Sequence, residues 1–158
     1  MPNQFIDVHG HVQFPDFDAD REAVIKRARE AGVKMIAVGT RAETSRKAIE
    51  VAHQFPKDVW ATVGFHPTEI GSENFDGSTG ASTELGRMSS PQVINALREL
   101  AADPKVVAIS ECGFDLFRDS DNLKLQEKIF AEQADLAREL NKPLMMHCRP
   151  SKGTDNAY

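Results

Sequence analysis

The chain has 158 residues, which is enough for one ordinary domain with a hydrophobic core. Its content of 41% hydrophobic and 27% charged residues excludes an intrinsically disordered chain and is typical of a soluble globular protein. The formal net charge of −5 excludes a general attraction to polyanions, so any binding of nucleic acid has to come from a local patch or from a metal ion.

Cellular location can be judged from three features of the sequence. No apolar run approaches the ~20 residues that are needed to cross a bilayer. The N-terminal sequence MPNQFIDVHG lacks the basic and apolar regions of a signal peptide. The two cysteines, Cys112 and Cys148, are expected to be reduced, buried thiols that face the helices. We therefore expect a cytoplasmic protein that does not associate with membranes.

Short apolar runs alternate with amphipathic stretches, as strands and helices do in an α/β protein. The first helix has candidate N-caps in Asp18 and Asp20 and a C-terminal stop in Gly32. In chain order, we predict a strand at 5–9, a helix at 20–32, a strand at 34–40, a helix at 42–55, a strand at 59–67, a helix at 90–102, a strand at 105–113, a helix at 121–140 and a strand at 142–148.

Most of these strands are apolar throughout, which favours a parallel sheet covered by helices. No predicted strand is followed by a GxGxxG or GxxxxGK[ST] pattern, so the common nucleotide-binding motifs have no support. Residues 69–90 are rich in Gly and Ser and only weakly periodic, and we expect them to form a long surface loop.

Three polar residues alternate along the first predicted strand, in the sequence FIDVHGHVQF. Residues two apart in a strand point to the same face, so Asp7, His9 and His11 share one face. Two neighbouring imidazoles in apolar surroundings are costly unless something pairs them, and one divalent cation can bind both. Taken alone, this motif also fits two histidines that are satisfied by hydrogen bonds at a strand end.

Polar residues at the ends of three other strands strengthen the metal interpretation. His66 ends the third predicted strand, Glu111 lies near the end of the fourth, and His147 near the end of the fifth. The carboxyl ends of parallel strands gather at one face, where ligands bind. We therefore expect a metal centre whose ligands are His9, His11, Glu111 and His147.

Glu111 is the natural bridge of this set, because one carboxylate can bind two cations. Two ions about 4 Å apart would activate a water and clamp a phosphate, so the expected chemistry is hydrolysis by a metal-activated water. Asp7 could orient a ligating imidazole. Arg149, two residues after His147, could hold a substrate anion, or it could form an exposed salt bridge.

These residues, with their surrounding sequence, resemble the TatD family of metal-dependent hydrolases. The matching stretches run in order from residue 5 to about 150: FIDVHGHVQFPDFDADREAVIKRA, VGFHP, AISECGFDLFR, the Q…F…Q…A pattern of the fourth helix and PLMMHCRP. The resemblance implies a TIM-type (β/α) barrel with up to two divalent ions (Mg, Mn or Zn) at its C-terminal face. It implies hydrolysis of phosphodiester bonds, as a deoxyribonuclease or 3′ exonuclease, although some relatives act on esters of aminoacyl-tRNA.

The family's site residues carry over position by position. His9 and His11 match the paired ligands of the first metal, Glu111 matches the bridging carboxylate of the GE-G-D stretch, and His147 matches a ligand of the second. His66 matches the histidine of the GxHP signature, which lies near the site. Together these considerations give the candidate catalytic residues as Glu111, Asp7, His66 and Arg149.

Two departures from the family pattern stand out. Ser110 takes the place of the glycine before the bridging glutamate. The TIM barrel typically needs about 250 residues, so we expect an α/β fold that is a partial barrel of about the first five strand–helix units. Residues 1–150 would form this incomplete domain and 151–158 a tail, as in a fragment or a truncated homologue. The family's later metal-binding histidine and aspartate have no counterpart, and we expect the open sheet edges to favour self-association.

Other classes of protein remain as alternatives at this point. The chain could be a non-catalytic module that binds a metal or a partner. A PHP-type phosphoesterase or a dihydroorotase-like amidohydrolase can also begin with HxH on the first strand. A PHP-type phosphoesterase requires a later ExH motif, and a dihydroorotase-like site often has a carboxylated lysine where this chain has Glu111. Both classes therefore fit the sequence less well.

Overall fold

The structure is a computed structural model, and it describes residues 5–69, 90–118 and 120–157. The loop expected at 69–90 lies outside the described residues except for its two end residues, which belong to the flanking helices. In order, the elements are β1 (Phe5–Gly10), η1 (Pro15–Phe17), α1 (Arg21–Glu30), β2 (Val33–Val38), α2 (Ala42–Gln54), β3 (Val59–Val63), η2 (Pro67–Glu69), α3 (Ser90–Ala101), β4 (Val106–Asp115), α4 (Leu123–Glu139) and β5 (Leu144–Arg149).

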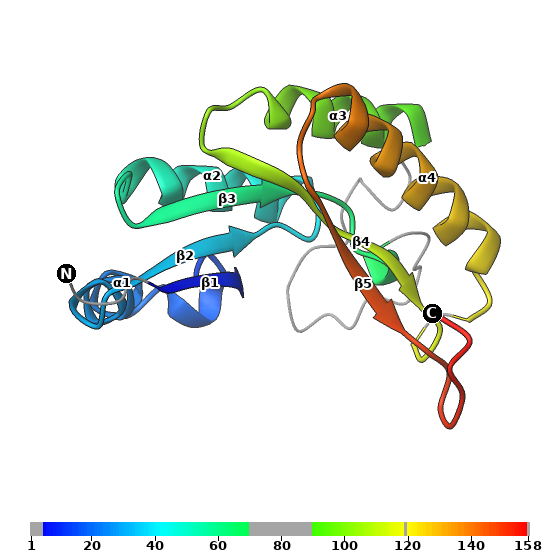
Figure 1. The fold of residues 1–158 in the computed structure, drawn as a ribbon, viewed down its shortest axis with the longest axis horizontal. Coiled ribbons are helices and arrows are strands. Elements are labelled where there is room, and N and C mark those ends of the chain that lie inside the picture. Colours follow the sequence, from blue (N-terminus) through cyan, green and yellow to red (C-terminus); the bar gives the residue numbers. More distant parts are fainter. Residues whose placement is uncertain (1–4, 70–89, 119, 158) are drawn as a thin grey trace.

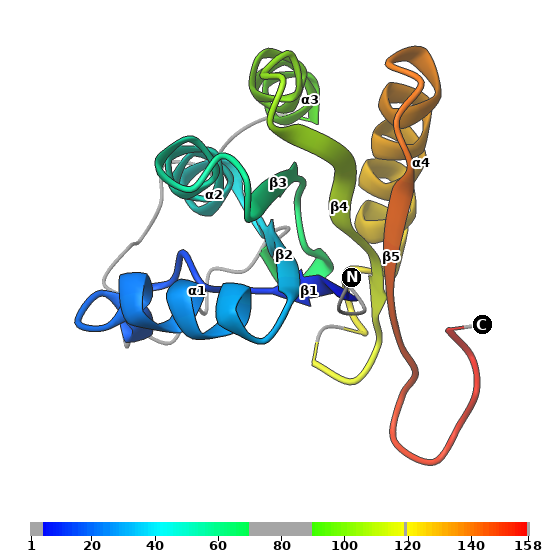
Figure 2. The same ribbon diagram turned by 60° about the vertical axis from the view of Figure 1, so that its left-hand side comes forward.

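The five strands form one parallel sheet in the order β1-β2-β3-β4-β5. The sheet curves, and the four α-helices lie along its outer side, as Figures 1 and 2 show. Each parallel pair needs a long crossover, and the intervening segments supply one, with a helix in each. The predicted fold, about five strand–helix units of a barrel, is confirmed as a half-barrel.

The core lies between the sheet and its helices. Alternate residues of the inner strands, such as Ala61 and Val63 of β3, are fully buried and belong to the same apolar cluster as Val51 of α2 and Leu97 of α3. Because the helices cover this face, strands β2, β3 and β4 have few exposed residues, as the apolar runs predicted. No helix in the described parts of the chain is long and apolar enough to cross a membrane.

The helices and strands begin and end close to the predicted residues. Asp20 occupies the N-cap position of α1 without a capping hydrogen bond from its side chain, and Gly32 has the positive φ of 75° that suits glycine after a helix. β4 extends to Asp115, beyond the predicted end at Gly113, because its last residues remain paired with β5 up to Arg149.

The two outer strands are less well covered than the inner ones. Phe5, Ile6 and Val8 of β1 and Met146 of β5 are all more than half exposed. β1 pairs only with β2 and β5 only with β4 among the described residues, so each has one open edge. After β5, residues 151–157 form hydrogen-bonded turns.

Candidate metal centre

The carboxyl ends of the strands meet at one end of the half-barrel, where four histidines and a glutamate gather. The structure brings together every side chain predicted as a metal ligand, with His66 beside them. They come from four strand ends: His9 in β1 and His11 just after it, His66 after β3, Glu111 in β4 and His147 in β5.

These residues form two groups that share one carboxylate. The first group is His9, His11 and Glu111, and the second is His66, Glu111 and His147. In each group, one ligand atom from each residue lies within 4.8 Å of the others. Glu111 is thus the residue that both groups share.

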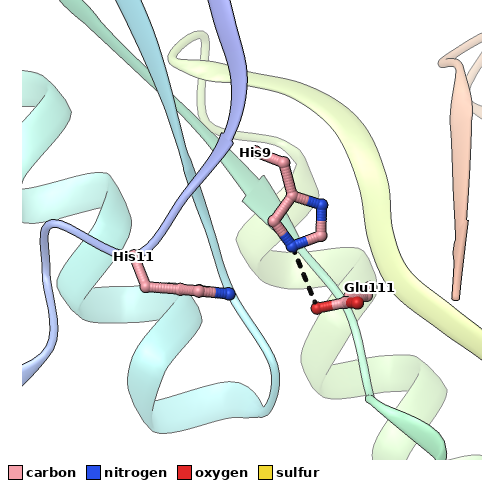
Figure 3. A group of neighbouring side chains, drawn as sticks. All are labelled: His9, His11 and Glu111. Atoms are coloured by element: carbon pink, nitrogen blue, oxygen red, sulfur yellow. Dashed lines mark ion pairs between the residues drawn. The ribbon is translucent and has the colours of Figure 1, made fainter.

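The first group lies at the β1 side of the site. His9 Nε2 is 3.3 Å from Glu111 Oε2, and Figure 3 shows both histidine rings directed toward that carboxylate. His11 Nδ1 donates a hydrogen bond to the carbonyl of Val38 at 2.9 Å. A carbonyl oxygen can only accept, so Nδ1 carries the proton of this bond, and Nε2 is the ring nitrogen left to bind a cation. Phe14 stacks on the His11 ring with centroids 4.6 Å apart, which further restricts its rotation.

His147 lies between two carboxylates in the second group. Its Nδ1 donates to Glu111 Oε1 at 3.0 Å and its Nε2 to Asp115 Oδ2 at 3.2 Å. The hydrogen bond to Glu111 raises the pKa of His147 most, and the charges of Glu111 and Asp115 add to the rise, against the opposing effect of burial. Without a cation, His147 therefore favours the charged form.

His66 completes the second group from the loop after β3. Its Nε2 is 3.9 Å from Glu111 Oε1, and its ring meets that of His147 edge-on with centroids 4.2 Å apart. Burial, aided by the charge of His147, lowers the pKa of His66 to about 4, so this imidazole is neutral near pH 7. Its Nδ1 accepts from the backbone N–H of Thr68 at 3.2 Å and lies 2.7 Å from the hydroxyl of the same residue, so in this arrangement the proton of the neutral ring is on Nε2.

Glu111 is almost fully buried and yet ionised. Burial opposes its charge, but the hydrogen bond from His147 and the nearby rings of His66 and His9 leave its pKa below the ordinary value. Its backbone N–H donates to the carbonyl of Gly39 at 3.1 Å, which ties this part of β4 to the end of β2.

Asp7 and Arg149, also predicted as site residues, make other contacts. The carboxylate of Asp7 accepts a hydrogen bond from the backbone N–H of His9 at 3.0 Å. The expected contact was with an imidazole, and this hydrogen bond is instead with the backbone of the strand. The guanidinium of Arg149 lies over the ring of Phe117, 4.2 Å from its centroid, and it forms no salt bridge with the residues that the structure describes.

Asp115 is a site residue that the sequence reasoning missed. Its side chain is fully buried; Oδ2 lies against His147, and Oδ1 accepts from the backbone N–H groups of Phe117 and Arg118 at 3.2 and 2.9 Å. Asp115 lies four residues after Glu111 and therefore on the same face of a continuous strand. This signal was overlooked because the strand was predicted to end at Gly113.

The two cysteines are free thiols with different exposure. Cys112 is fully buried, and burial together with the charge of Glu111 raises its pKa to about 12, so it stays protonated. Cys148 is only partly buried. Burial as a small apolar group is thus confirmed for Cys112, and for Cys148 only in part.

The donor set of each group fits a divalent cation. Two imidazoles and a carboxylate are ordinary protein ligands of such ions, with nitrogen favouring zinc and oxygen favouring manganese and magnesium. The ionised Glu111 is in the state that ligation requires, and the hydrogen bond of His11 Nδ1 leaves its Nε2 for a cation. The neutral His66 would have to carry its proton on Nδ1, toward the hydroxyl of Thr68, for its Nε2 to bind a cation.

The chain is similar to several known proteins. It is 38% identical over 144 residues to a protein of Erwinia tasmaniensis and 40% identical over 134 residues to one of a Rahnella species, both named "3'-5' ssDNA/RNA exonuclease TatD". These matches cover 90% and 84% of this chain but 49% and 45% of the relatives. The chain thus spans about half the length of the curated relatives it matches.

A solved structure agrees with these matches. YJJV, a TatD homologue from Escherichia coli K12, is 30% identical and superposes with a TM-score of 0.74, covering 97% of this chain and 53% of that one. The family model described as TatD-related DNase matches residues 6–157. The sequence motifs, the half-barrel and these comparisons lead to one conclusion: the chain belongs to the TatD-related DNase family.

Proposed function

We propose that the chain holds two divalent cations at the end of the half-barrel and hydrolyses phosphodiester bonds of single-stranded nucleic acid. The observation that carries this proposal is the shared carboxylate of Glu111, which lies within ligand distance of both histidine groups. The names of the relatives, exonucleases of single-stranded DNA and RNA, support the choice of substrate.

Under this proposal, each of the two groups would bind one cation. His9 and His11 would hold one ion, and His66 and His147 the other, with Glu111 binding both. Cations held there would supply an activated water nucleophile and neutralise the phosphate charge that builds up during hydrolysis. Asp115 would hold His147 in orientation through their hydrogen bond, and Asp7 would fix the backbone of His9.

The anionic substrate needs cationic contacts, since the chain itself carries a net negative charge. The bound ions would provide most of this attraction. Arg149, near the C-terminal end of β5, is partly exposed, and its guanidinium could bind a phosphate from its place over Phe117. We infer further that the protein acts in the cytoplasm, where reduced thiols such as Cys112 and Cys148 persist.

A second candidate function is binding of metal or of a partner without turnover. It is favoured by the exposed apolar side chains of Phe5, Ile6 and Val8 in β1, which offer a surface to a partner. The two candidates differ in a single assay, because both predict bound metal and only the first predicts cleavage.

The test is an exonuclease assay on the 158-residue chain with single-stranded DNA and RNA labelled at the 3′ end, in the presence of Mg²⁺, Mn²⁺ or Zn²⁺. We expect metal-dependent release of nucleotides from the 3′ end and a loss of at least about 100-fold in rate for Glu111→Gln. The variant His53→Ala is the control, because His53 lies outside the site and pairs with Asp103. Bound metal without any release of nucleotides would favour the second candidate.

A further inference from the structure

The buried face of α4 carries two glutamines where an apolar residue would be expected. Gln126 and Gln133 are both fully buried, as are Ile129, Leu136 and Ala137 on the same helix. Residues seven apart lie on one face of a helix, so the two amides point the same way along α4. A buried amide is costly unless it is hydrogen-bonded, so each of these side chains calls for a structural reason.

Gln133 pairs with both backbone groups of a single residue. Its Oε1 accepts from the N–H of Phe65 at 2.8 Å, and its Nε2 donates to the carbonyl of Phe65 at 3.1 Å. A neighbouring strand would pair these groups in the same way, but Phe65 lies two residues beyond the end of β3. Phe65 directly precedes His66, whose own N–H donates to the carbonyl of Thr40 at 2.9 Å.

Gln126 makes the equivalent pair at the end of β4. Its Oε1 accepts from the N–H of Asp115 at 2.9 Å, and its Nε2 lies 3.5 Å from the carbonyl of the same residue. Asp115 in turn binds His147 through its side chain. Each glutamine therefore holds the backbone of a residue next to the second group, since Phe65 precedes His66 and Asp115 bonds to His147.

We infer that Gln126 and Gln133 are positioning residues for the second cation site, formed by His66, Glu111 and His147. α4 fixes the loop after β3 through Gln133 and the end of β4 through Gln126, and so sets the position of the His66 ring relative to that of His147. Among the described residues, Gln133 bonds to the backbone of Phe65, which adjoins His66 and is not a ligand of the first site, formed by His9, His11 and Glu111. Loss of Gln133 should therefore act on the second site.

The inference rests on the proposed function for its metal readout, so the test begins with a measurement that needs no metal. In the metal-free chain, the ring protons of His66 and His147 are assigned by NMR, and the nuclear Overhauser effect between the two rings is measured. Gln133→Met keeps the approximate length of the side chain and removes both hydrogen bonds to Phe65. Ile129→Ala is the matched control, because it weakens packing of the same buried face and leaves the hydrogen bonds between Gln133 and Phe65 in place.

We expect Gln133→Met to shift the His66 ring signals and weaken the contact with His147, while Ile129→Ala leaves both unchanged. Equal changes in the two variants would overturn the inference, since they would indicate a general packing effect. Unchanged signals in Gln133→Met would overturn it as well.

The metal readout is a calorimetric titration of the same variants with Mn²⁺. Gln133→Met should raise the dissociation constant of the second ion by about 10–100-fold and leave the first unchanged. Equal weakening of both ions in this variant would count against the inference. If the wild-type chain binds no second ion, the proposed function fails, and the NMR comparison alone decides the role of the glutamine.

Discussion

Glu111 is the residue that both histidine groups share. It receives His9 on one carboxylate oxygen and His147 on the other, with His66 nearby. A carboxylate in this position can be a ligand of two cations, whereas each histidine can be a ligand of only one. The two groups should therefore respond differently to loss of single histidines.

We predict that the loss of a single histidine removes one cation and leaves the other bound. His9→Ala should abolish the first cation site and spare the second, because His9 belongs to the first group alone. His147→Ala should do the reverse. Calorimetric titration with Mn²⁺ measures both sites in each variant, with His53→Ala as a control that binds as the wild type does. A loss of both ions in His9→Ala would contradict this prediction.

The residue types of the site could be predicted from the sequence, but not all of their contacts. His9 and His11 were recognisable by their spacing in a strand, and Glu111, His66 and His147 by their places at strand ends. Asp7 and Arg149 were predictable as neighbours of ligands, but which atom a flexible side chain contacts depends on the elements around it. The contact of Asp7 with a backbone N–H is an example.

Among the elements, β3 and β4 determine how closely the site can assemble. Gly64 lies between the end of β3 and His66, and it packs against the backbone of Ser110 and Glu111. A Cβ added at Gly64 would lie 2.7 Å from the amide nitrogen of Glu111 and closer still to the carbonyl of Ser110. Only glycine lets the two backbones come this close.

We therefore predict that Gly64→Ala separates the strands and displaces Glu111. The change should lower the free energy of unfolding by about 1–3 kcal/mol and weaken both cation sites. Urea denaturation and Mn²⁺ titration measure the two effects. Gly10→Ala is the matched control, because its Cβ would meet only ordinary contacts, the nearest at 3.6 Å from Asp7 Oδ2. Equal loss of stability in both variants would refute this explanation.

The order and type of these elements could be read from hydrophobic periodicity, but their exact ends could not. β4 runs to Asp115 because of its pairing with β5, a contact between segments more than 30 residues apart. The contacts of Gln126 and Gln133 depend on the same kind of long-range packing. The Q…F…Q…A pattern of the fourth helix includes both residues, but only the packed structure reveals their backbone partners.

Over the residues that the structure describes, the sheet is a half-barrel whose outer strands, β1 and β5, are each paired on one side only. β1 exposes Phe5, Ile6 and Val8, and β5 exposes Met146, so apolar side chains lie beside unpaired strand edges. Such edges promote association between chains. The self-association expected from the sequence thus has a structural basis, although it stays a prediction.

We predict concentration-dependent self-association through the β1 edge. Sedimentation velocity should show it at micromolar concentrations, and Ile6→Lys should reduce it by placing a charge on the edge. Gln54→Lys adds the same charge at an exposed position of α2 and should leave association unchanged. A wild-type chain that remains monomeric at all concentrations would show that the open edge is not used.

The measurement that tests the central claim most directly is the metal content per chain, by elemental mass spectrometry, of the protein equilibrated with divalent cations and freed of excess. The two-site arrangement around Glu111 predicts two ions per chain, one remaining in a His9→Ala/His11→Ala variant and none in Glu111→Gln. A wild-type chain that retains no metal, or equal metal in Glu111→Gln, would contradict the assignment of this cluster as a metal centre.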